Sequence, residues 1–159
     1  PSVLYRNNLF EQFPPEFAQS PVGDYFLHML NARFGKIKKL PDVMAVYRLH
    51  ESNNWANTDV TTLLPKWLKT LELMQPCFNV EIKQLLLTQY ANLAFELATK
   101  LAASKSMYEA GIYLQKSINS DLMVATNRII ALQNTKDYKI GHFILRPFRY
   151  IKHICLKFQ

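Results

Sequence analysis

The sequence predicts an α+β fold that is mostly helical, with a few strands near the start and a helical subdomain after them. From Asp24 to Phe34 the apolar residues recur at helical spacing, whereas from Ile37 to Tyr47 they follow the spacing of short strands. After Trp55 helical patterns follow one another and only two glycines occur, which is typical of a helical bundle. We expect three parts, comprising residues 1–55, 56–135 and 136–159.

The first helix is expected to begin at Asp24 and to end near Gly35. Its apolar side consists of Phe26, Leu27, Leu30 and Phe34. Gly35 stands where a helix C-terminus favours a residue that adopts positive φ. Two short strands are expected next, on either side of Pro41. They run through Ile37 and Leu40, and through Val43 and Tyr47.

This segment carries a family resemblance. Gly23 and Asp24 open the helix, Gly35 closes it, and the residues from Met44 to His50 read M-A-V-Y-R-L-H. In this order and spacing they resemble the acceptor half of the inverting nucleotide-sugar glycosyltransferases with the GT-A fold (family 2-like). The resemblance covers roughly the first third of the chain, and it implies that this part belongs to the catalytic domain of such an enzyme.

The resemblance implies a site in which a carboxylate and a metal ion act together. Asp24 matches the family's catalytic base, which takes the proton from an acceptor sugar hydroxyl as that hydroxyl attacks the anomeric carbon of the donor. His50 matches a histidine that, in some members, helps hold a divalent metal ion, Mn²⁺ or Mg²⁺, on the donor diphosphate. Arg48 and Trp55 are the expected substrate-binding residues, Arg48 facing the diphosphate and Trp55 stacking on a sugar ring.

The residue types alone leave other roles open for the same positions. Asp24 suits a helix N-cap, because its carboxylate accepts hydrogen bonds from the first free amides. A single histidine after a strand is commonly a surface or core residue, and His50 has no second ligand at metal-binding spacing. Arg48 also fits a structural cation, and Trp55 fits an aromatic that anchors a loop.

The family also has a nucleotide-binding half, which precedes the acceptor half and ends in an Asp-x-Asp. This chain contains no Asp-x-Asp, and it begins at Pro1, next to residues 2–7 that fit a strand of the fold. We therefore expect a C-terminal fragment, inactive alone, of an enzyme that transfers a sugar from a nucleotide sugar to a glycan or lipid-linked saccharide. Its surface toward the nucleotide-binding half should be apolar, so self-association into a homo-oligomer is expected.

Four helices are expected in residues 56–135. They run from Asp59 to Met74 with Thr58 as the N-cap, from Val80 to Ser104, onward from Ser106, and onward from Asp121. Pro65 either kinks the first of these helices or starts a second piece. One helical pair is too few for a repeat array, so a generic helical hairpin is expected. If Asp24 is only a cap, the alternative function is a non-catalytic helical protein-interaction module.

The basic residues gather at the end of the chain. Residues 136–159 hold six lysines and arginines against one acidic residue, whereas residues 1–135 hold 13 against 11. An amphipathic helix is expected there, and Arg146, Arg149 and Lys152 on its charged side would face an anionic membrane surface. A helix that caps the bundle with its charges in solvent is the other interpretation. No nucleic acid partner is expected, because no recognised binding motif accompanies these charges.

Cysteine use and hydropathy indicate the compartment. Cys77 and Cys155 are the only cysteines and lie far apart in the sequence, so neither a disulfide framework nor a zinc motif is expected. No stretch of the sequence is long and apolar enough for a transmembrane span. The expected location is the cytoplasm, including a peripheral position on the inner face of the membrane.

Overall fold

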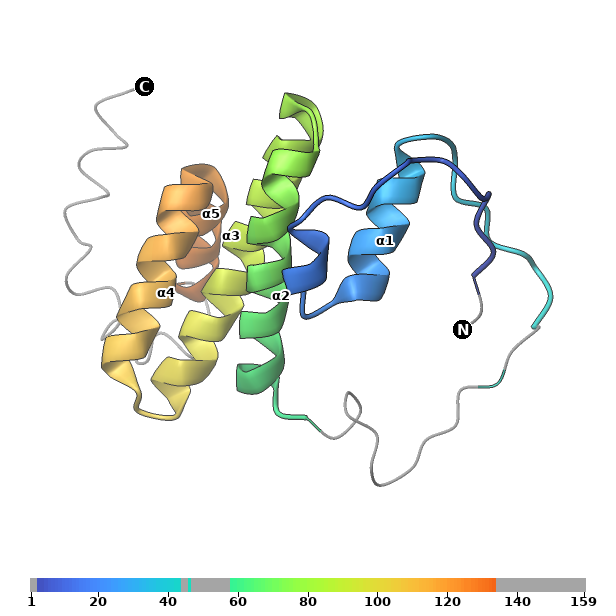
Figure 1. The fold of residues 1–159 in the computed structure, drawn as a ribbon. Coiled ribbons are helices and arrows are strands. Elements are labelled where there is room, and N and C mark those ends of the chain that lie inside the picture. Colours follow the sequence, from blue (N-terminus) through green and yellow to red (C-terminus); the bar gives the residue numbers. More distant parts are fainter. Residues whose placement is uncertain (1–2, 44–45, 47–57, 134–159) are drawn as a thin grey trace. The chain divides into compact units, whose positions relative to one another are not determined.

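The computed structural model describes residues 3–43, 46 and 58–133 (Figure 1). These residues form five α-helices and two short 3-10 helices, and no strand is present among them. The mostly helical class is therefore confirmed for the described part of the chain. Contacts divide the chain into two units, Pro1–Asn79 and Val80–Gln159. The first unit holds η1 (Phe17–Gln19), α1 (Gly23–Ala32), α2 (Val60–Met74) and η2 (Gln75–Cys77).

Helix α2 begins at a side-chain cap and continues through a proline. The Asp59 carboxylate accepts a hydrogen bond from the Thr61 backbone N–H at 2.7 Å, so the N-cap is Asp59 rather than the expected Thr58. Pro65 lies inside α2 and does not divide it. One side of the helix is buried at helical spacing. Its buried residues are Leu64, Leu68, Thr70, Leu71 and Met74.

Thr70 joins α2 to the start of α1. Its hydroxyl accepts hydrogen bonds from the Val22 backbone N–H and from the Ser20 hydroxyl, each at 3.2 Å. The same hydroxyl donates to the Lys66 carbonyl within α2 at 3.0 Å. Thr70 is fully buried, so these bonds lie away from water, where leaving the Val22 N–H without a partner would cost about 1–3 kcal/mol. The polar bonds of Thr70 therefore fix where α1 begins.

Aromatic rings pack against the buried Phe26 of α1. Phe26 is fully buried, and its ring meets the Phe17 ring edge-on with centroids 5.6 Å apart. Phe17 stacks in turn on Phe13, whose ring packs against Phe10. Leu30 of α1 is buried as well, so the apolar packing of the described residues before α2 includes these rings and Leu30. Short and irregular segments can thus be held in place by ring contacts instead of a strand ladder.

Two expectations for the segment after α1 are wrong. Gly35 does not adopt positive φ, because α1 already ends at Ala32 and its last carbonyls accept hydrogen bonds from the N–H groups of Arg33 and Phe34. The strand expected through Ile37 and Leu40 is absent, and residues 36–43 are irregular. A strand requires a neighbour that shares its backbone hydrogen bonds, and the described residues provide none.

The strand expected at residues 2–7 is also absent over its described part, which begins at residue 3. The strand expected through Val43 and Tyr47 lies mostly outside the described residues. Apolar side chains of these segments remain in solvent, with Leu4 96% and Val43 93% exposed. The apolar pattern that predicted strands is thus present without the burial that would stabilise them.

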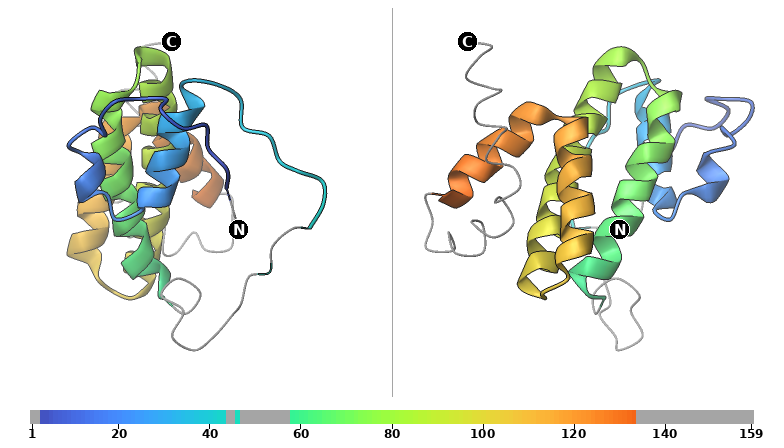
Figure 2. Two further views of the ribbon diagram at one scale, coloured as in Figure 1. Left: turned by 45° about the vertical axis from the view of Figure 1, so that its right-hand side comes forward. Right: turned by 90° about the vertical axis from the view of Figure 1, so that its left-hand side faces the viewer.

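The second unit is built from α3 (Val80–Ala103), α4 (Met107–Ser120) and α5 (Leu122–Gln133). Helices α3 and α4 form a hairpin and α5 packs against both, as the views in Figure 2 show. The turn after α3 has Lys105 at φ 67°, with the Ser106 N–H bonded to the Leu101 carbonyl and the Lys105 N–H bonded to the Ala102 carbonyl. These two bonds close a Schellman motif, in which lysine occupies the position usually taken by glycine. The helices expected in this part of the sequence are confirmed.

Small residues let α4 approach α3 closely. The buried small residues of α3 are Ala91, Ala94, Ala98 and Ala102. On α4 the hydroxyl of Ser117, fully buried, donates to the Ala91 carbonyl at 2.8 Å. Leu114 packs with Ala98 and the buried Phe95 in the same core. Alanine and serine at facing positions shorten the distance between helix axes, which allows this bond across the interface.

Asp121 follows α4 in the chain and connects the start of α5 to α3 by a side-chain hydrogen bond. It lies between α4 and α5, and one carboxylate oxygen accepts the Val124 N–H at 3.1 Å as an N-cap does. The other oxygen accepts the Thr88 hydroxyl of α3 at 2.7 Å. The Thr88 bond, followed by the Val124 bond, lowers the pKa of Asp121 below its ordinary value.

The capping role of Asp121 predicts an acid-dependent stability. Because its pKa is lower in the folded chain, the ionised carboxylate stabilises the fold above its unfolded pKa, and this contribution is lost as pH falls through the folded pKa. Asp121→Ala should lower the free energy of unfolding by about 1–2 kcal/mol at neutral pH. Asp121→Asn should retain part of the capping hydrogen bonding, but its free energy of unfolding should change less with pH in the acid range. Urea unfolding at neutral and acidic pH would measure both, and equal acid dependence in wild type and Asp121→Asn would contradict the assignment.

Candidate active site on helix α1

Asp24 lies in the first turn of α1, with its side chain exposed. The N-cap of this helix is Val22, whose side chain makes no capping bond. Asp24 is therefore not the cap that its residue type alone favoured. One carboxylate oxygen accepts the Tyr25 N–H at 2.8 Å. The carboxylate is thus held at the surface and is accessible to a ligand.

The space beside Gly23 is open. A Cβ atom built on Gly23, the preceding residue, would have no other heavy atom within 4 Å. Gly23 also has no positive φ, so neither backbone strain nor tight packing requires glycine there. A side chain at this position would project into open space.

Two further polar side chains lie near Asp24 on the same unit. His28 is one helical turn after Asp24, so the two residues share a face of α1. The Tyr5 hydroxyl, from the segment before η1, forms a hydrogen bond with Nδ1 of His28. The two rings also contact each other, with centroids 5.7 Å apart at an angle of 42°. Tyr5 is thereby attached to the helix that carries the candidate base.

The charge of Asp24 acts on Tyr5. Partial burial of the phenol, and second the negative charge of the Asp24 carboxylate, raise the pKa of Tyr5 above its ordinary value. A raised pKa keeps the Tyr5 hydroxyl protonated throughout the neutral range. The three side chains of Tyr5, Asp24 and His28, which we term the α1 cluster, therefore combine a carboxylate, an imidazole and a neutral phenol.

Other contacts hold the cluster on a fixed support. The Tyr25 ring meets the Trp67 ring of α2 edge-on, with centroids 5.1 Å apart. Thr70 of α2 binds the Val22 N–H directly before α1. The start of α1 is therefore fastened to α2 by an aromatic contact and by a buried hydrogen bond, and a site placed on a rigid element keeps its geometry.

Cys77 is a free cysteine at the end of η2. Its thiol lies 3.9 Å from a carboxylate oxygen of Glu16 and 3.8 Å from the Leu73 carbonyl. Burial, followed by the charge of Glu16, raises the pKa of the Cys77 thiol. The thiol form is therefore favoured, and Cys77 is a structural residue.

Most of the site residues expected from the sequence fall outside the described residues. These are Arg48, His50 and Trp55 of the expected site, and Arg146, Arg149 and Lys152 of the expected membrane-facing tail. Within residues 3–43, 46 and 58–133 no three His, Cys, Asp or Glu side chains gather in a way that could hold a metal ion. Over the same residues, no helix has the length and hydropathy needed to cross a membrane.

The sequence analysis missed Tyr5 and His28. The spacing of His28 from Asp24 places the two on one helix face, and this signal was available once the helix was predicted. No local pattern connects Tyr5 to α1, because the contact depends on the path of the irregular chain between them. Comparison of the chain with protein-family models, with curated proteins and with solved structures finds no match.

Proposed function

We propose that this chain is the acceptor-side part of a glycosyltransferase that transfers a sugar, with inversion, from a nucleotide sugar to a glycan or lipid-linked saccharide. The observation that carries the proposal is Asp24, an exposed carboxylate in the first turn of α1, where Val22 and not Asp24 is the N-cap residue. An inverting transferase needs one base beside the acceptor hydroxyl, and a carboxylate on a rigid helix supplies it.

In the proposed reaction the acceptor hydroxyl lies beside Asp24. Its oxygen attacks the anomeric carbon of the donor from the face opposite the nucleotide, and the carboxylate takes the hydroxyl proton. The bond from the anomeric carbon to the nucleoside diphosphate breaks, so the configuration at that carbon inverts. The carboxylate is exposed, so a saccharide can reach it. Positioning the two reactants contributes to the rate together with proton transfer.

Exposed apolar side chains support the assignment to one part of a larger catalytic domain. Ile37 is 71% and Val46 92% exposed, although both lie in a stretch whose composition favours strands. Strands form when a neighbour supplies backbone hydrogen bonds. We propose that these residues pair with the nucleotide-binding part of the enzyme, which would also provide most ligands of the divalent metal ion. The described residues do not fit a metal site by themselves, and the role of Asp24 as base does not depend on one.

The proposal is tested by assaying the intact enzyme with a set of nucleotide sugars and glycan acceptors in the presence of Mn²⁺. We expect release of nucleoside diphosphate that depends on the acceptor, and a product whose new glycosidic bond has the opposite anomeric configuration to the donor. The isolated 159 residues should not transfer sugar. A product of retained configuration, or the absence of any glycoside product from the intact enzyme, would contradict the proposal.

A further inference from the structure

The segment after α1 exposes basic and apolar side chains next to one another. Every residue from 33 to 40 is exposed, and the stretch reads R-F-G-K-I-K-K-L. Four of these residues are basic, and no acidic residue lies between Asp24 and Asp42. Among the charges Phe34 is 48% and Leu40 is 52% exposed. A surface that presents positive charge together with apolar side chains fits a partner that is anionic and also accepts apolar groups.

Ring contacts hold Phe34 at this surface. Its ring lies 6.1 Å from the Phe10 ring, which in turn packs against Phe13 with centroids 4.9 Å apart. Phe13 is exposed as well. The Arg33 guanidinium carbon lies 5.8 Å from the centre of the Phe34 ring, so a positive charge is placed beside an exposed aromatic side chain. The row of rings that packs on α1 therefore also supports the exposed rings of this surface.

We infer that residues 33–40, which we term the basic segment, bind an anionic lipid bilayer together with Phe13. Anionic headgroups attract lysine and arginine, while aromatic and aliphatic side chains enter the boundary between headgroups and acyl chains. A nucleic acid would pair with the charges and leave Leu40 in water. Backbone pairing of Ile37 with the nucleotide-binding part, as proposed above, does not use the charged ends of the lysines. The basic segment is separate from residues 136–159, the membrane-facing tail expected from the sequence.

The inference goes beyond the proposed function and does not depend on it. It has one consequence if that function holds. Arg33 follows directly after α1, and this helix is ten residues long, so a bilayer at the basic segment lies within about 15 Å of Asp24. A lipid-linked saccharide would then be held at the membrane close to the proposed base.

Co-sedimentation of the 159-residue chain with vesicles tests the charges. The vesicles contain phosphatidylserine and phosphatidylcholine, or phosphatidylcholine alone. Three lysines of the basic segment are changed together to glutamine, namely Lys36, Lys38 and Lys39. Binding to the anionic vesicles should fall about 100-fold, which corresponds to roughly fivefold for each lysine. Wild-type binding should also weaken as the salt concentration rises, because the attraction is screened.

A matched control removes the same amount of charge elsewhere. It changes three exposed lysines of α2 and α3 to glutamine, namely Lys69, Lys83 and Lys100. This control should bind anionic vesicles like the wild type. Both sets are repeated in a chain that carries Arg146→Gln, Arg149→Gln and Lys152→Gln, which removes charges of the tail. That chain should still bind, and the binding should be lost when the lysines of the basic segment are changed.

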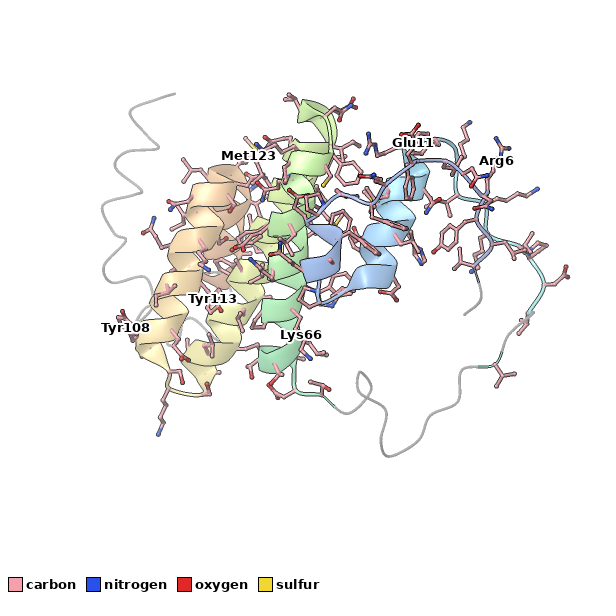
Figure 3. The ribbon with its side chains drawn as sticks, viewed as in Figure 1. Arg6, Glu11, Lys66, Tyr108, Tyr113 and Met123 are labelled. Atoms are coloured by element: carbon pink, nitrogen blue, oxygen red, sulfur yellow. The ribbon has the colours of Figure 1, made fainter. Side chains whose placement is uncertain are left out.

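A second set of variants tests the apolar side chains. Phe34→Ser with Leu40→Ser should lower binding to anionic vesicles about tenfold, because two apolar side chains no longer enter the interface. Leu40→Ser alone should act in the same direction. Tyr108→Ser is the matched control, since Tyr108 lies on α4 of the second unit and is 83% exposed (Figure 3). Circular dichroism should be the same for all variants, which would exclude loss of the fold as the cause.

Four results would overturn the inference. The first is equally weak binding of the wild type to both kinds of vesicle, and the second is equal loss in the lysine variant and its control. The third is binding to vesicles that Phe34→Ser and Leu40→Ser leave unchanged, together with tighter binding of a single-stranded oligonucleotide, which would assign the segment to a nucleic acid. The fourth is self-association that Leu40→Ser abolishes in a chain that binds no vesicles, which would assign it to a second copy. The proposed function stands in each case, since none of these measurements depends on sugar transfer.

Discussion

Under the proposed function, replacing Asp24 with asparagine in the intact enzyme is expected to reduce the rate of sugar transfer by about 100-fold or more, because the acceptor hydroxyl would lose its proposed general base. The amide has nearly the size of the carboxylate, and its oxygen can still accept the Tyr25 N–H. Asp24 is not the N-cap of α1, so the helix itself should be unaffected. The KM for the nucleotide sugar should stay close to that of the wild type, since the base contacts the acceptor.

Two comparisons make this result specific. Asp42→Asn removes a carboxylate from an exposed position of the same unit and should leave transfer unchanged. Circular dichroism of Asp24→Asn should match that of the wild type, which would exclude loss of the helix as the cause. Near-normal turnover in Asp24→Asn would show that another group takes the proton, and the general-base assignment would fail.

The helices could be predicted because their signals are local. The apolar spacing before Gly35, the cap before α2 and the long pattern of α3 all occur within single stretches of sequence. Boundaries differed by one or a few residues, as at Asp59 in place of Thr58. The strand predictions were wrong because the contacts that stabilise a strand are not local. A strand depends on a partner elsewhere, and residues 36–43 have none among the described residues.

The candidate site likewise has residues that the sequence predicted and residues that only tertiary contacts bring together. Asp24 was expected as the base from the family resemblance, because its residue type and its place at a helix start alone favoured a cap. The structure adds that its carboxylate is exposed and that Val22 is the N-cap residue. The contribution of Tyr5 depends on a hydrogen bond to His28 between segments that are distant in sequence. Thr70, which holds the start of α1, likewise reaches Val22 from another helix. Tertiary contacts of this kind leave no periodic pattern, and only the folded chain shows them.

Phe26→Ala is expected to cost about 3–5 kcal/mol of the free energy of unfolding of the first unit. Phe26 has no exposed surface, and its ring meets Phe17 at 5.6 Å within the row of aromatic rings that packs on α1. Alanine would leave a cavity beside the Phe17 ring, because the rings before α1 already pack against one another and the surrounding structure relaxes only partially. The loss should exceed that of any other single substitution considered for this unit.

Urea unfolding followed by tryptophan fluorescence would measure the effect, because both tryptophans, Trp55 and Trp67, belong to the first unit by sequence. Phe34→Ala is the matched control, since Phe34 is 48% exposed and the same change there should cost clearly less. Since α1 carries Asp24 and His28, partial unfolding of this unit should also lower transfer in proportion to the folded fraction. An equal urea midpoint for Phe26→Ala and wild type would mean that the aromatic rings packed on α1 do not stabilise this helix. Only the contacts of α1 with α2 would then remain to hold Asp24 in place.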